Sequence, residues 1–139
     1  MLRLIALLLL FPSFAFAATK HAPLPDAVYS AKTVYIANQS GYQSTVDGAY
    51  DALTKWGKFT VVSDRSKADL IITFGNTPDL DKGTTTVGTF SMIVTIPGSS
   101  DAVFQTESIG KGFHIASNRG GVAARACIDQ FKKRLETSR

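Results

Sequence analysis

The chain has 139 residues, a length typical of one domain, and a formal net charge of +4 at pH 7. A single cysteine excludes an intramolecular disulfide, so the protein is no disulfide-stapled scaffold. The basic excess is concentrated after residue 118, where six basic residues stand against two acidic ones.

The N-terminus has the three parts of a secretory signal peptide. Arg3 supplies a positive charge, Leu4 to Phe11 is an unbroken apolar run of eight residues, and Ala15-Phe16-Ala17 is a small-x-small cleavage site. A membrane-spanning helix needs about 20 apolar residues, and a proline and a serine end this run much earlier. We therefore expect export and cleavage after Ala17, with an uncleaved N-terminal anchor as the alternative. Removal of residues 1–17 leaves a mature chain of 122 residues.

The mature chain begins with a segment that lacks periodicity. Residues 18–31 contain two prolines and predict an extended leader, and residues 32–139 predict a single α/β domain. Thr33 to Ala37 is β-branched and aromatic, which is typical of a strand, and residues 38–41 predict a turn.

A helix is expected next, starting at a Ser44 and Asp47 capping box and ending at Gly57. Its predicted apolar stripe consists of Val46, Ala49, Tyr50, Leu53 and Trp56. We expect Trp56 to be largely buried where this helix meets the sheet. Residues 59–62 then predict a second strand, which a right-handed crossover places parallel to the first.

The remaining elements complete a mixed sheet of about five strands. One helical turn is expected at 64–68, and the apolar run 69–74 predicts a central strand covered on both faces. Residues 86–96 and 102–106 predict an antiparallel hairpin. In the longer of these two strands, only alternate residues are consistently apolar, so one face should be packed and the other wet; the expected packed residues are Phe90, Met92, Val94 and Ile96.

The last helix is expected to start at Ser117 or Asn118 and to pack on the sheet. Its predicted buried stripe consists of Ala124, Cys127, Ile128, Phe131 and Leu135. Cys127 is therefore expected to be an inert core thiol. Gly120 and Gly121 predict either a close approach of helix to sheet or a helix that starts after them.

A search for catalytic, cofactor and metal motifs predicts no such residue. His21 and His114 share no cluster of acids or thiols, so no zinc site is expected. Residues 79–83 resemble the opening of a calcium loop, but its twelfth position falls on Phe90. Residues 110–115 resemble a dinucleotide fingerprint but follow the hairpin instead of the first strand.

Two further patterns have simple interpretations. Asp47 and Asp51 stand one helical turn apart beside Lys55, which favours a solvated helix face over an acid and base pair. Asn38-Gln39-Ser40 is formally a glycosylation sequon, which matters only in a eukaryotic host.

The basic last helix is the feature most able to select a partner. Nucleic-acid binding is not expected, because the segment carries only one aromatic residue, Phe131, on its predicted buried face. Arg125, Lys132, Lys133 and Arg134 are interpreted as a solvated face. Contact with an anionic surface such as lipid head groups stays open as an alternative.

Three stretches carry a family resemblance: Ala31-Lys32-Thr33-Val34-Tyr35-Ile36, the pattern from Ala52-Leu53 through Trp56-Gly57-Lys58-Phe59 to Val61-Val62, and Lys67-Ala68-Asp69-Leu70-Ile71. They resemble a family of small exported bacterial hypothetical proteins. More distantly, their order is similar to the αβ domain of the TolB N-terminal region, the curli secretion protein CsgG and periplasmic activators of peptidoglycan synthases. The resemblance spans Ala31 to Leu135 and transfers no catalytic residue. It implies a non-catalytic component of the cell envelope or of an assembly.

The sequence thus predicts an exported, non-catalytic binding or accessory module of the bacterial cell envelope, with an envelope protein as its partner and no cofactor. The sheet surface or the loops are the expected contact site. A secreted structural or stress-response protein is the alternative, and a small enzyme of unrecognised type is a further one.

Overall fold

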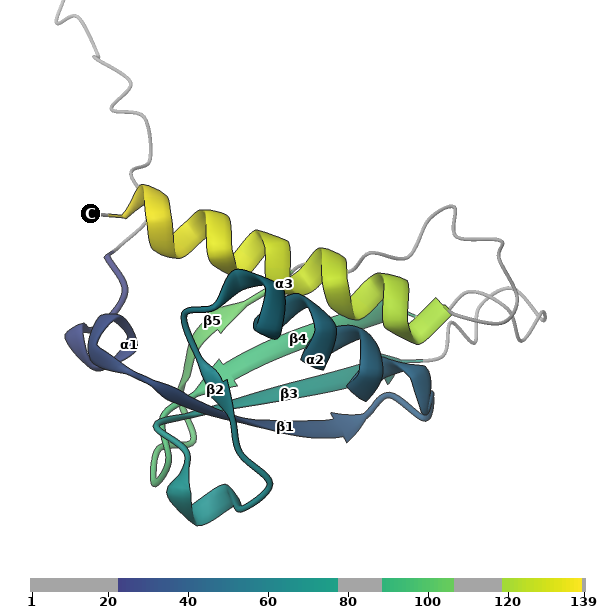
Figure 1. Ribbon diagram of the computed structural model, residues 1–139, viewed down its shortest axis with the longest axis horizontal. Helices are drawn as coiled ribbons and strands as arrows, with labels where there is room; N and C mark the ends of the chain where they lie inside the picture. The colour runs from purple at the N-terminus through teal and green to yellow at the C-terminus, as the bar shows by residue number, and fades with distance from the viewer. Residues whose placement is uncertain (1–22, 78–88, 107–118, 139) are drawn as a thin grey trace, which may run out of the picture.

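The computed structural model describes residues 23–77, 89–106 and 119–138. It forms a single α/β domain, with one five-stranded sheet and two long helices that pack on each other and on the sheet (Figure 1). This confirms the predicted fold class. In chain order the elements are α1 (Asp26–Ser30), β1 (Thr33–Gln39), α2 (Ser44–Trp56), β2 (Thr60–Val61), the 3₁₀ turn η1 (Arg65–Lys67), β3 (Leu70–Thr77), β4 (Thr89–Thr95), β5 (Ala102–Gln105) and α3 (Arg119–Thr137).

The sheet has the strand order β2-β1-β3-β4-β5. The first strand, β1, lies between β2 and β3 and is parallel to both, which confirms the predicted βαβ unit. The hairpin prediction is also confirmed, because β4 is antiparallel to both β3 and β5. The apolar strand β3 is the middle strand, as its composition predicts, but the prediction of cover on both faces is wrong, because the two helices pack on one of its faces only.

Asp69 joins the starts of the two central parallel strands. Its Oδ2 accepts hydrogen bonds from the backbone N–H groups of Lys32 (2.8 Å) and Thr33 (3.0 Å). Its own N–H donates to the Oγ1 of Thr33 at 2.9 Å. These hydrogen bonds hold the pKa of the Asp69 carboxyl below its ordinary value, because both N–H groups favour the ionised form. The carboxylate thus sets the register of β1 against β3.

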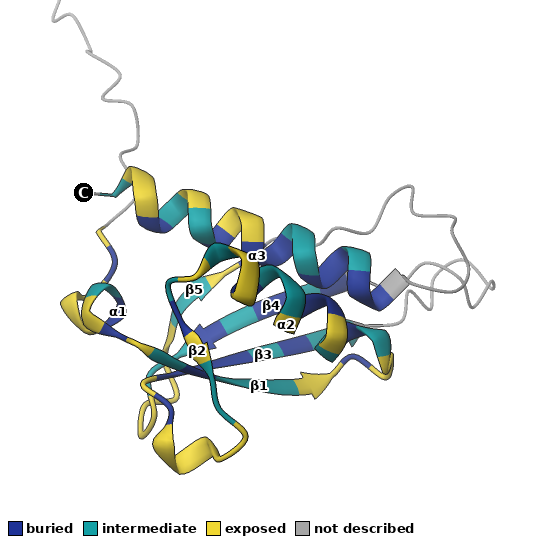
Figure 2. Ribbon diagram, in the orientation of Figure 1, coloured by how far each residue is buried: buried dark blue, intermediate teal, exposed yellow. Residues whose placement is uncertain are grey.

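Alternation along the strands divides the sheet into a packed face and an open face. The packed face points to α2 and α3, and its fully buried members are Val34, Leu70, Ile72, Phe74, Met92 and Val94. The predicted stripe of α3 is confirmed, since Ala124, Cys127, Ile128, Phe131 and Leu135 are all buried. Figure 2 shows this buried stripe along the inner side of α3. The core therefore lies in one layer, between the sheet and the two helices.

The buried face of α2 differs from the predicted one. Tyr50 is 54% exposed and Val46 is half-buried, whereas Thr45 and Gly48 are buried beside the correctly predicted Ala49 and Leu53. The face is rotated because α2 packs against α3 as well as against the sheet. A buried stripe that contacts two neighbouring elements is centred between them, and Tyr50 therefore points into solvent.

The two helices touch at their glycines. A β-carbon added at Gly48 would overlap the backbone of Gly121, and one added at Gly120 would overlap the side chain of Thr45. The N–H of Gly121 also donates to the Oγ of Ser44 at 3.3 Å. Gly120 and Gly121 lie inside α3, so the predicted close approach exists, but it is between helix and helix and not between helix and sheet.

The start of the domain and the start of α2 differ from the prediction, whereas the end of α2 agrees with it. Residues 26–30 form α1, with Leu24, Val28 and Ala31 buried in the core, so the predicted extended leader is wrong here. These apolar residues cover the end of the core. The free energy gained by burying them stabilises a helix even though two prolines precede it. The predicted capping box is also wrong, because Ser44 lies inside α2 and has no capping bond. Gly57 ends α2 at φ 72°, as predicted.

Several predictions fall on residues that the structure does not describe. They concern the signal peptide at 1–17, residues 79–83 and 110–115, His21 and His114, and the cap of the last helix. Within the described ranges, no helix is long and apolar enough to cross a lipid bilayer.

Candidate functional site

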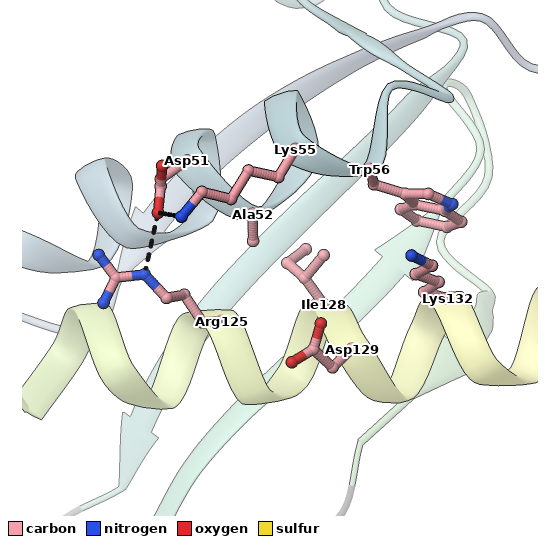
Figure 3. A pocket seen from close by; sticks show the side chains of 8 residues that line it. All are labelled: Asp51, Ala52, Lys55, Trp56, Arg125, Ile128, Asp129 and Lys132. Carbon is pink, nitrogen blue, oxygen red and sulfur yellow. Dashed lines mark hydrogen bonds and ion pairs between the residues drawn. The ribbon is translucent and has the colours of Figure 1, made fainter.

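Two surfaces carry the chemistry from which a function can be argued. The first is a groove of about 190 Å³ between α2 and α3 (Figure 3). The second is the open face, the side of the sheet that points away from both helices. The groove exists because the glycine contact brings the N-terminal half of α2 close to α3, and larger side chains separate the helices farther along.

The polar end of the groove is an ion-pair network built from both helices. The Oδ2 of Asp51 lies 3.1 Å from the Nζ of Lys55 and 3.3 Å from the Nε of Arg125 (Figure 3). The hydrogen bond from Lys55, helped by Arg125, lowers the pKa of Asp51 below its ordinary value. Asp51 therefore stays ionised at neutral pH and holds two cations, so it is unsuited to donate a proton.

The other end of the groove is aromatic and apolar. Trp56 projects from the end of α2 above Lys132 of α3 (Figure 3). Its indole makes edge-to-face contacts with the rings of Phe59 and Phe131, and the distances between ring centroids are 5.1 Å and 5.8 Å. Trp56 is half-buried, so the expectation of a largely buried ring holds only in part. One side of the ring packs against the core, and the other side lines the groove.

The charged groups at the polar end of the groove pair with one another at the surface. Its carboxylates and cations are surface groups, and the side chains of Asp51, Lys55 and Arg125 are 39%, 75% and 43% exposed. Among the residues that the structure describes, no three potential metal ligands gather in one place. The thiol of Cys127 is buried in the core and contacts the hydroxyl of Thr106 at 3.5 Å. Burial raises the pKa of this thiol, which disfavours the reactive thiolate.

The middle of the open face contains three rows of cross-strand neighbours. The rows are Tyr35, Ile71 and Thr95; Ala37, Thr73, Ile93 and Gln105; and Gln39, Gly75 and Ser91. None of these ten residues is charged, although 26 of the 139 residues in the chain are acidic or basic. Solvent-exposed sheet faces ordinarily carry charged and polar side chains. An uncharged face of this kind is typical of a surface that another molecule covers.

The middle of the open face is the most apolar part. Ile71 is only 4% exposed where it sits between Tyr35 and Thr95, and Ile93 is half-buried one row away. The neighbouring residues Ala37, Gly75 and Ser91 have small side chains that project little from the sheet. The face therefore has a largely covered apolar centre and a rim of hydroxyl and amide groups.

The two edges of the sheet are poor docking sites by comparison. The edge strand β2 has only two residues, and the pairing of β4 with β5 shifts its register between Val94 and Thr95. Short strands and irregular pairing are features that discourage the addition of a further strand. A partner that recognises the sheet therefore has its better surface on the open face.

The residues of the predicted basic face do not form one patch. Arg125 pairs with Asp51, Lys132 lines the groove, and Arg134 donates to the Oγ of Ser138, while Lys133 is exposed elsewhere on α3.

The other polar residues considered in the sequence lie apart from one another. Asp51 belongs to the groove, and Asp47 lies on the exposed side of α2. The amide of Asn38 in the sequon donates to the carbonyl of Tyr42 at 2.9 Å and serves the turn after β1.

The groove is the feature that the sequence did not predict. Asp51 and Arg125 are 74 residues apart, and no local spacing indicates that they meet. The open face, in contrast, had a local signal in the alternation along β4.

No protein-family model matches this sequence, and no curated protein sequence matches it.

Proposed function

We propose that this protein is an exported, non-catalytic binding or accessory module of the bacterial cell envelope, and that it contacts its partner through the open face of its sheet. The signal peptide at 1–17 directs export, with cleavage after Ala17. The resemblance to envelope and assembly proteins, which covers Ala31 to Leu135, supports the same role.

The observation that carries the proposal is the absence of charge on the open face. Ile71 is already only 4% exposed, whereas Tyr35 and Ile93 keep part of their side chains in contact with water on the side of the sheet away from the core. Covering these side chains with a partner removes apolar area from water and stabilises a complex by about 25 cal/mol per Å². A charged face would lose part of that gain to the cost of desolvation.

The groove gives no support to an enzymatic role. Its best-placed carboxylate, Asp51, is engaged by Lys55 and Arg125, and the Cys127 thiol lies in the core. A nucleophile or an acid and base pair would have to combine access to a substrate with a tuned pKa. The groove residues are better suited to hold the helices together.

The proposal is tested by capture from an envelope extract with the tagged mature chain. Three baits are compared: the natural chain, Thr73→Glu at the middle of the open face, and Thr54→Glu on the exposed side of α2. We expect the natural chain and the control to retain the same partner and Thr73→Glu to lose it, because a carboxylate in the interface is desolvated without a counter-ion.

Equal capture by all three baits would place the contact on another surface, and no capture by any of them would remove the support for an accessory role. Circular dichroism and urea unfolding establish that both variants fold. Intact mass of the exported protein tests the leader separately, because cleavage after Ala17 predicts a chain that starts at Ala18.

A further inference from the structure

We draw no further inference here: the strongest candidate, the groove between α2 and α3, carries nothing, because Asp51 at its polar end is already paired with Lys55 and Arg125, and the two other charged residues that line it, Asp129 and Lys132, are of opposite sign and so select no class of ligand.

Discussion

Replacement of Gly48 by alanine tests the contact between the two helices. In an isolated helix this change stabilises by about 1 kcal/mol, because alanine has the higher helix propensity. In this protein the new β-carbon would meet the backbone of Gly121, whose Cα lies 2.5 Å from the place that the carbon would take. Neither backbone can rotate away, so α2 and α3 must separate. Overpacking of this kind costs about 3 kcal/mol at the upper end of its range, which leaves a net destabilisation of about 2 kcal/mol.

The assay for this prediction is urea unfolding followed by fluorescence of Trp56. With a slope of about 2 kcal/mol per molar urea, a loss of about 2 kcal/mol lowers the midpoint by about 1 M. The control is Thr54→Ala, which gives α2 a smaller gain in helix propensity at an exposed position and should stabilise by about half a kcal/mol. A Gly48→Ala protein as stable as the natural chain, or more stable, would refute the close crossing of the helices.

Three other perturbations have defined outcomes. The pKa of the Asp69 carboxyl is lower in the folded protein than in the unfolded chain. The stability that this carboxylate contributes is therefore complete above its unfolded pKa of about 3.9 and is lost as the pH falls through the folded pKa. We expect Asp69→Asn to be less stable than the natural chain near neutral pH, and its urea midpoint to fall less between about pH 5 and about pH 2. Trp56→Ala should destabilise by about 2 to 3 kcal/mol, at or just below the range for a core tryptophan, because the ring is half-buried against Phe59 and Phe131; a loss below about 1 kcal/mol in urea would contradict this packing. Replacing Lys132 and Lys133 together by glutamine should change stability by less than about 0.5 kcal/mol, and sedimentation with acidic vesicles that is both salt-sensitive and lost in this double variant would instead indicate anionic-surface binding.

The sequence predicts the fold well where a single periodicity controls an element. The stripe of α3 and the packed side of β4 follow directly from residue spacing, because each element buries one face against one neighbour. The apolar run of β3 likewise indicates its central place.

Prediction fails where burial is shared between neighbours or decided far along the chain. Tyr50 fits the spacing of a buried stripe, yet α3 shifts the buried side of α2 toward Gly48. The segment that forms α1 directly follows two prolines, and only its packing against the core makes it helical. Local pattern carries no information about either contact.

The same division applies to the candidate surfaces. The alternation in β4 indicates that one of its sides is wet, but the uncharged open face emerges only when β1, β3 and β4 lie in register. The ion pairs of Asp51 cannot be read from the sequence, because Arg125 reaches it from a helix 74 residues away.

The central claim, that the open face is covered when the protein works, is tested most directly by thiol labelling in intact cells. Cysteine is placed at Thr73 on the open face in one full-length chain and at Thr54 on α2 in another. The natural thiol at Cys127 is buried, and its raised pKa keeps its background reaction slow. In dilute purified protein both new cysteines should react with a maleimide, and their rates there are the reference for the rates in cells. In cells, the account predicts that Thr73→Cys is strongly protected and Thr54→Cys is not. Equal labelling of the two cysteines in cells would contradict the account, whatever partner had been supposed.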